Sequence, residues 1–177
     1  MLTVAINIGS NWYKLVLVLH ILCAIIGFGA VFLNGVYGNE MKRRKGPDAL
    51  AIYEANWKVS KIGQYFIYAV FVLGLALIGM SDKEWKFSQT WVWLAIVLYV
   101  VAVGLSHGVL LPAVKRIGVL MREMVAAGPP AGGPPPQAAE MGQLGKRVAV
   151  TGTTLDLMLI AILVLMVFKP GAPGLGF

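Results

Sequence analysis

Four long apolar runs constrain the fold of this chain more than any other feature. They cover residues 15–37, 62–80, 91–113 and 148–168, about half of the 177 residues. A helix that crosses a lipid bilayer needs roughly 20 predominantly apolar residues, and its backbone groups must be hydrogen-bonded within the helix. The runs therefore predict an all-α fold, a bundle of four transmembrane helices that forms one integral membrane domain over 1–177.

The composition supports a membrane protein. The chain is 58% hydrophobic and 13% charged, whereas a soluble domain is about 25% charged. The longest connection is polar and rich in proline, so we predict a flexible Pro/Gly linker over 126–142 and no separate soluble domain. Basic residues stand next to Ile117, Val119, Leu120 and Met121 over 115–124, and this pattern predicts a helix that lies along the membrane surface.

The positive charges are unevenly distributed. The net charge is +7, and eleven of the fifteen Lys and Arg residues lie between the first two runs or between the last two. These eleven are Lys42, Arg43, Arg44, Lys45, Lys58, Lys61, Lys115, Arg116, Arg122, Lys146 and Arg147. Because cytoplasmic loops carry the excess of Lys and Arg, both termini are predicted outside and the basic loops in the cytoplasm. This explains the charge without a nucleic-acid partner.

Smaller features bound the partners and the processing of the chain. The cluster of Lys42, Arg43, Arg44 and Lys45 predicts contact with anionic lipid headgroups. The single cysteine, Cys23, leaves no intramolecular disulfide and no multi-cysteine metal centre. No basic stretch precedes the first run, so we expect no cleavable signal peptide and a first span that is retained.

Two histidines and one acid lie inside the runs: His20, His107 and Asp156. Such residues are costly in a bilayer, so each is a functional hypothesis. His107 and Asp156 both lie roughly 12 Å from the cytoplasmic end of their spans. We therefore predict a polar intramembrane cluster of Asn34, His107, Thr153 and Asp156. Two interpretations stay open: a structural hydrogen-bonded pair of His107 with Asp156, or a proton-relay or ligand site.

His20 also has two interpretations. One is a neutral imidazole that hydrogen-bonds across a tight helix interface, and the other is an axial ligand of a haem. His20 and His107 differ in depth by roughly 16 Å along the membrane normal. This offset argues against one haem held between the two histidines.

The first span resembles a known group of proteins. Residues 13–22 read Tyr-Lys-Leu-Val-Leu-Val-Leu-His-Ile-Leu and residues 27–33 read Gly-Phe-Gly-Ala-Val-Phe-Leu. With a His near the end of the third span, they resemble small bacterial four-helix membrane proteins. These include an uncharacterised family of predicted integral membrane proteins and, more distantly, the copper-resistance D type and the membrane-bound, haem-linked protoporphyrinogen oxidase type. The resemblance implies a multi-pass protein of the bacterial inner membrane.

The haem-linked branch of this group implies a b-type haem or porphyrin near His20 or His107. The chain departs from that branch at two points. Asn34-Gly35 stands where the branch tends to have a Pro-Arg pair, and the third run contains no lysine. The uncharacterised family therefore matches the residues better.

Two classes of function follow. The first is a non-catalytic accessory or structural subunit that docks other membrane protein subunits through its lipid-facing surfaces or basic loops. We favour it because the chain has no nucleotide motif, no Ser/His/Asp nucleophile arrangement and no carboxylate pair, and we predict no metal site. The second class is a b-type haem or porphyrin-binding protein of redox or tetrapyrrole metabolism. A transporter ranks third, because four spans without an inverted repeat offer no pathway by themselves.

Overall fold

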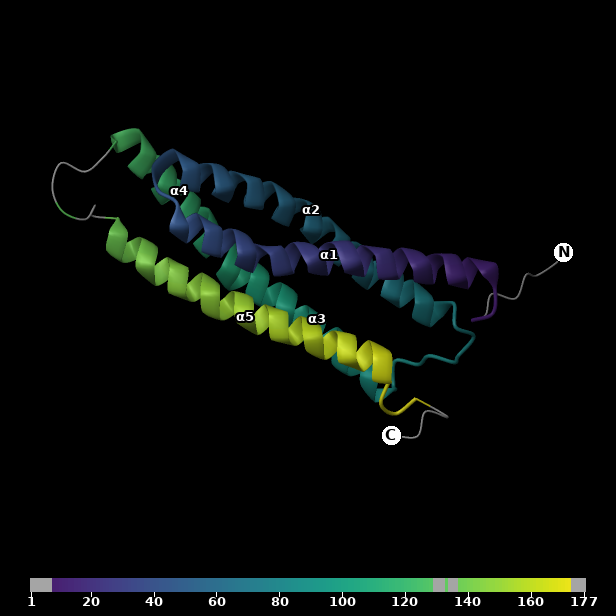
Figure 1. Cartoon of the computed structure of the whole chain (residues 1–177). Helices are drawn as coiled ribbons and strands as arrows, with labels where there is room; N and C mark the ends of the chain where they lie inside the picture. The colour runs from purple at the N-terminus through teal and green to yellow at the C-terminus, as the bar shows by residue number, and fades with distance from the viewer. Residues whose placement is uncertain (1–7, 129–132, 134–136, 173–177) are drawn as a thin grey trace.

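The computed structural model describes residues 8–128, 133 and 137–172. In this part of the chain all regular structure is helical: α1 (Asn11–Arg43), α2 (Gly46–Gly79), α3 (Thr90–Leu105), the π-helical turn η1 (Ser106–Leu110), α4 (Leu111–Ala127) and α5 (Ala138–Phe168). Because α3, η1 and α4 are continuous, the chain forms four rods, each long and apolar enough to cross a membrane (Figure 1). The predicted all-α, four-span architecture is confirmed.

The rods are longer than the predicted spans. They contain 33, 34, 38 and 31 residues, against the roughly 20 that a bilayer requires. The extra turns lie mostly at the end where α1 turns into α2 and where α4 leads to α5 (Figure 1). This end also carries the eleven basic residues of the two long connections, and α1 begins and α5 ends at the opposite end of the bundle.

The prediction of a surface-lying helix over 115–124 is wrong. These residues belong to α4, which continues the rod of α3 beyond η1. Ile117 and Met121 pack with Ala49 and Tyr53 of α2 in a buried cluster, and the Tyr53 hydroxyl donates to the Val114 carbonyl oxygen at 3.2 Å. The apolar side chains that suggested a lipid surface are buried against a neighbouring helix instead.

The predicted linker over 126–142 is too long at both ends. Residues 126 and 127 complete α4, and residues 138–142 form the first turns of α5. Residues 129–132 and 134–136, at the centre of the prediction, lie outside the described residues. Ala, Glu and Met at 138–141 are good helix formers, and the packing of Met141 against the cluster around Ile117 stabilises this helix start.

The helices associate as two pairs. Helices α1 and α2 are joined by only two residues and pack closely through small side chains. A Cβ added to Gly63 would lie 2.4 Å from the Ala30 Cβ, and one added to Gly27 would lie 3.0 Å from Ile67 Cγ1. Small residues permit this close approach of membrane helices. The second pair is formed by α5 and the α3–α4 rod.

Aromatic side chains separate α2 from α3. The rings of Phe71 and Tyr99 stack with centroids 4.5 Å apart and an interplanar angle of 7°, and the Tyr99 hydroxyl donates to the Ile67 carbonyl oxygen at 3.3 Å. A stacked pair spans more distance between two backbones than a contact of small residues. The two helix pairs therefore meet through side chains at mid-bundle.

Tryptophans close the end of the bundle opposite the basic loops. The Trp85 indole N–H donates to the Tyr13 hydroxyl at 3.0 Å, and Trp85 meets Trp91 edge to face. The Lys169 ammonium lies 4.1 Å from the Trp85 ring centroid. Partial burial lowers the pKa of Lys169 from its ordinary value, while the cation–π contact stabilises its charged form.

Candidate functional site

A large, partly open cavity lies between the two helix pairs. Its volume is about 2650 Å³, and residues of every helix line it. Typical pockets for small molecules measure roughly 300–1,000 Å³, so this cavity has room for a long molecule or for several small ones. Most of the lining surface is apolar, but polar and charged side chains, including Lys61 and Asp156, also line it. The cavity is the candidate functional site.

Three polar residues of the lining bond to one another across the gap between α2 and the α3–α4 rod. His107 Nε2 lies 2.7 Å from the Tyr68 hydroxyl and 2.9 Å from the Gln64 amide nitrogen. The Gln64 amide also donates to the Tyr68 hydroxyl. We call these three residues the Gln64 cluster.

The tautomer of His107 follows from its other nitrogen. Nδ1 lies 2.9 Å from the Val103 carbonyl oxygen, which can only accept a hydrogen bond, so Nδ1 carries a proton. In the neutral ring Nε2 is then an acceptor, directed at the Gln64 cluster. His107 lies within η1, and π-helical turns inside longer helices occur frequently at functional sites. The wider turn displaces the backbone around His107 from the α-helical register.

All the residues of the predicted polar cluster line the cavity: Asn34, His107, Thr153 and Asp156. Their hydrogen bonds are not those expected. Asn34 Oδ1 accepts from the Ser60 hydroxyl at 2.7 Å, and His107 bonds to α2. Among the described residues no hydrogen bond or ion pair joins His107 to Asp156, so that pairing stays a prediction.

Sequence reasoning missed Gln64 and Tyr68 as the partners of His107. A usable signal was present, because residues four apart share a helical face and both side chains are polar inside an apolar run. What the sequence did not reveal is which residue of the third span this face meets.

His20 lies at another place on the cavity wall, on α1. Its ring packs against Gly74 of α2, where an added Cβ would lie 3.2 Å from His20 Cε1. The buried Nδ1 makes no hydrogen bond with a described residue, although the Val70 backbone is close enough to influence the ring. The imidazole is therefore held by packing and by a backbone hydrogen bond at Val70, and its buried Nδ1 is the ring nitrogen without a hydrogen-bond partner among the described residues.

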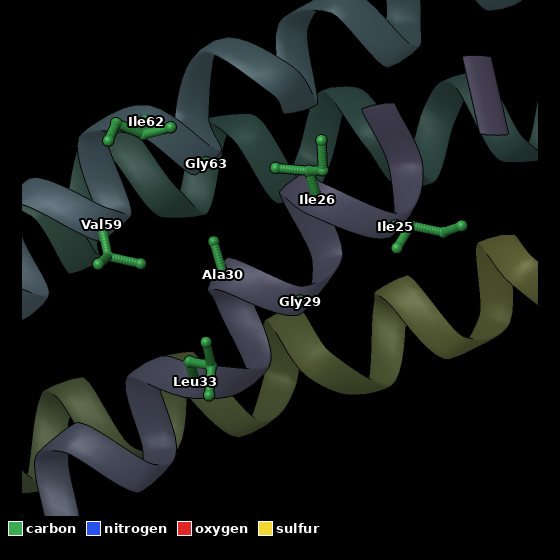
Figure 2. A pocket seen from close by; sticks show the side chains of 8 residues that line it. All are labelled: Ile25, Ile26, Gly29, Ala30, Leu33, Val59, Ile62 and Gly63. Carbon is green, nitrogen blue, oxygen red and sulfur yellow. The ribbon is translucent and has the colours of Figure 1, made fainter. Parts of the chain in front are cut away.

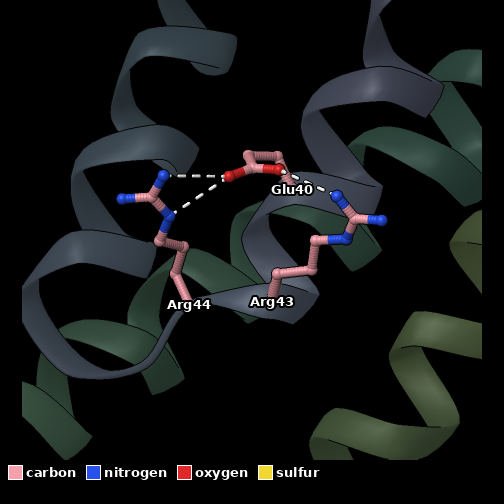
Figure 3. Close-up of polar contacts among 3 residues, drawn as sticks. All are labelled: Glu40, Arg43 and Arg44. Atoms are coloured by element: carbon pink, nitrogen blue, oxygen red, sulfur yellow. Dashed lines mark hydrogen bonds and ion pairs between the residues drawn. The ribbon is translucent and has the colours of Figure 1, made fainter.

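Charged residues organise the basic end of the bundle. Glu40 pairs with Arg44 at 3.0 Å and with Arg43 at 3.9 Å within one helix end (Figure 3). Between helices, Arg116 of α4 binds Glu140 of α5 with two hydrogen bonds, at 2.7 and 3.0 Å. Glu40 thus offsets part of the positive charge of residues 42–45, because both Arg43 and Arg44 pair with its carboxylate.

The outer surface of the α1–α2 pair is apolar and nearly flat. Figure 2 shows a shallow groove on it that is lined by Ile25, Ile26, Gly29, Ala30, Leu33, Val59, Ile62 and Gly63. Ile25 and Ile62 are more than half exposed. Large exposed apolar side chains suit contact with acyl chains, so this surface faces lipid in a bilayer.

Comparisons with known proteins now give the family. A family model described as "Predicted integral membrane protein (DUF2269)" matches residues 14–170, which cover all four rods. A search of curated proteins finds no match, and neither does a search of solved structures. The expected likeness to an uncharacterised membrane protein family is confirmed, whereas that to the copper-resistance D and protoporphyrinogen oxidase types stays a prediction. The chain belongs to this family of predicted integral membrane proteins.

Proposed function

We propose that this protein is a non-catalytic membrane subunit that holds a lipid-soluble molecule between its two helix pairs. The observation that carries the proposal is the cavity of about 2650 Å³. Apolar space left empty between helices costs free energy, and this space is partly open to its surroundings, so an apolar molecule from the bilayer can enter and fill it. Its apolar lining suits the body of an amphipathic molecule, and its polar side chains suit a head group.

The route of entry follows from the arrangement of the helices. Mid-bundle contacts between α2 and α3 are made by side chains such as Phe71 and Tyr99, whereas α1 and α2 approach through their backbones. Movement of aromatic side chains requires less rearrangement than separation of two closely packed helices. The ligand is therefore expected to enter from the bilayer between α2 and α3.

Mass spectrometry of co-purified molecules tests this function. The protein is purified in detergent and extracted with organic solvent, and the extract is compared with that of two variants. Gly152 lines the cavity, and an added Cβ there meets nothing within 4 Å, so Gly152→Phe fills the space. Gly29 is also open but lies in the outer groove, so Gly29→Phe is the matched control.

The proposal expects a compound that is enriched with the wild-type protein and with Gly29→Phe and lost from Gly152→Phe. Equal extracts from all three folded proteins, or no enriched compound at all, would contradict a ligand-holding role.

His20 supports a second candidate, a b-type haem or porphyrin in the same cavity. Its imidazole lines the cavity, and its buried Nδ1 has no hydrogen-bonding partner among the described residues. A bound haem would take an imidazole nitrogen as axial ligand. An absorption spectrum of protein from haem-replete cells tests this. A Soret band that is lost in His20→Leu and retained in Cys23→Ala supports the candidate, and a featureless spectrum of the folded protein rejects it.

We propose further that the basic end faces the cytoplasm, because eleven of the fifteen basic residues lie there. Lys42, Arg43, Arg44 and Lys45 would then meet anionic lipids, and the same end would dock a larger membrane complex.

The orientation is tested with a fluorescent protein that matures only in the cytoplasm. Fused after residue 177, beyond the end of α5 that lies opposite the basic loops, it is expected to stay dark. Bright fusions would reverse the orientation.

A further inference from the structure

Where the three side chains of the Gln64 cluster meet, hydrogen-bond donors outnumber acceptors, because Gln64 faces the other two residues with its amide nitrogen and not with its oxygen. The Nδ1–H of His107 is used by the Val103 carbonyl oxygen. The acceptors that remain are one lone pair on His107 Nε2 and the Tyr68 hydroxyl oxygen, which the Gln64 amide reaches. The donors are the Tyr68 hydroxyl proton and the two protons of the Gln64 amide nitrogen. However these bonds are shared, one donor proton is left without an acceptor among the described residues.

The orientation of the Gln64 amide follows from the same contacts. If the amide were turned, its oxygen would lie 2.9 Å from the lone pair of His107 Nε2, and two acceptors would face each other. The nitrogen therefore points at His107. A donor left unsatisfied in an apolar environment costs free energy, so the cluster calls for an acceptor atom from outside the chain.

We propose that the Gln64 cluster binds a carbonyl oxygen of a lipid-soluble quinone, an inference that rests on the proposed ligand-holding function. The head group must accept a hydrogen bond. We take it to be uncharged, because the three residues include no Lys or Arg and the ammonium of Lys61, one turn away on α2, lies over the Trp57 ring instead. An anionic head desolvated without a cation is strongly disfavoured. A quinone carbonyl meets both conditions, and an apolar tail fits the rest of the lining.

Ring faces near the cluster favour a planar head group. The rings of Tyr68 and His107 stack with centroids 6.1 Å apart, and the Phe71–Tyr99 stack follows one helical turn along α2. Aromatic rings prefer offset-stacked or edge-to-face neighbours. A flat quinone ring gains such contacts, whereas the ester carbonyl of a lipid gains none.

Equilibrium binding of a decyl-tailed benzoquinone to the full chain in lipid nanodiscs tests the proposal. The donor count predicts a specific order of effects. Gln64→Met removes both amide protons, and the remaining Tyr68 proton is taken by His107, so the affinity should fall about tenfold. Tyr68→Phe leaves two amide protons against one lone pair, so a donor remains and the affinity should change less than about threefold. Tyr65→Phe, on the lipid-facing side of the same helix and 69% exposed, should change nothing.

A decyl-tailed benzene without carbonyl groups is the matched control ligand and should bind at least about tenfold more weakly. If both ligands bind equally, or if Tyr68→Phe weakens quinone binding as much as Gln64→Met, the proposed recognition is wrong while the ligand-holding function stands. If neither ligand binds and no compound co-purifies with the folded protein, the proposed function fails as well.

Discussion

The contact between α1 and α2 and the contact between α2 and α3 differ in how they bring two helices together. At the first, a Cβ added to Gly63 would lie 2.4 Å from the Ala30 Cβ, so backbones approach directly. At the second, the stacked rings of Phe71 and Tyr99 lie between the helices. Both contacts are made by one helix, α2, on two of its faces.

This difference explains why the bundle contains a cavity. Lipid is as apolar as the helices, so helix association in a bilayer depends on close packing and interhelical hydrogen bonds rather than on a hydrophobic driving force. Small residues give close packing and leave no space, as between α1 and α2. Large rings hold helices apart, and the space beside each ring remains as cavity. The side chains of α2 thus determine both the close packing of α1 on α2 and the cavity between α2 and α3.

The largest expected effect comes from breaking the close contact. Gly63→Leu places a branched side chain where even a Cβ would overlap Ala30, so the free energy of unfolding should fall by about 3 kcal/mol. Denaturation in mixed micelles measures this. Gly104→Leu, at a mid-helix glycine with nothing within 4 Å of an added Cβ, should cost much less. Equal losses in the two variants would show that the α1–α2 contact is not tight.

A smaller effect is expected from removing the Tyr99 ring, which with Phe71 holds α2 and α3 apart. Tyr99→Leu loses the ring stack with Phe71 and the hydrogen bond to the Ile67 carbonyl, about 1–2 kcal/mol together. The same unfolding assay measures it, with Tyr65→Leu on the exposed face as control. The variant should also retain less of any co-purified ligand, because α3 can move toward α2. Full retention of the ligand by Tyr99→Leu would argue that the Tyr99 ring does not hold α2 and α3 apart.

The smallest effect is expected at the basic end, beyond the apolar runs. The hydrogen bonds from Arg116 hold the pKa of Glu140 below its ordinary value, and both side chains are well exposed. A lowered folded-state pKa contributes stability above the ordinary carboxyl pKa, and this contribution disappears as the pH falls through the lowered value. The free energies of unfolding of wild type, Arg116→Gln, Glu140→Gln and the double variant form a double-mutant cycle. Measured at neutral and at acid pH, the cycle gives the interaction energy between Arg116 and Glu140. An interaction energy between Arg116 and Glu140 that stayed the same in acid would contradict a stabilising ion pair.

Much of the fold was predictable from the sequence because hydropathy in a bilayer leaves few alternatives. The four apolar runs predicted the four spans. His20, Ala24 and Asn34 are spaced so that they share one face of a helix, and all three line the cavity. The sequence also predicted a helix over 115–124, but not that it continues the rod inside the bundle, because this depends on the buried contacts of Tyr53 with Ile117 and Met121.

The candidate site was only partly predictable. A regular α-helix places Gly104 and Gly108 on the face of His107, but an added Cβ at either glycine meets nothing within 4 Å. The π-turn η1 changes the register there, and no residue type in Ser106–Leu110 signals it. The partners of His107 depend on that register and on the aromatic spacing of α2 from α3. Neither property is a local one that sequence periodicity can reveal.

A cryo-electron microscopy structure of the protein in nanodiscs made with native lipids tests the central claim most directly. The account predicts that α2 and α3 stay apart, with Phe71 and Tyr99 stacked between them. It also predicts elongated non-protein density in the cavity that reaches the Gln64 cluster. Direct packing of α2 on α3, with the cavity closed and His107 turned away from Tyr68, would contradict it.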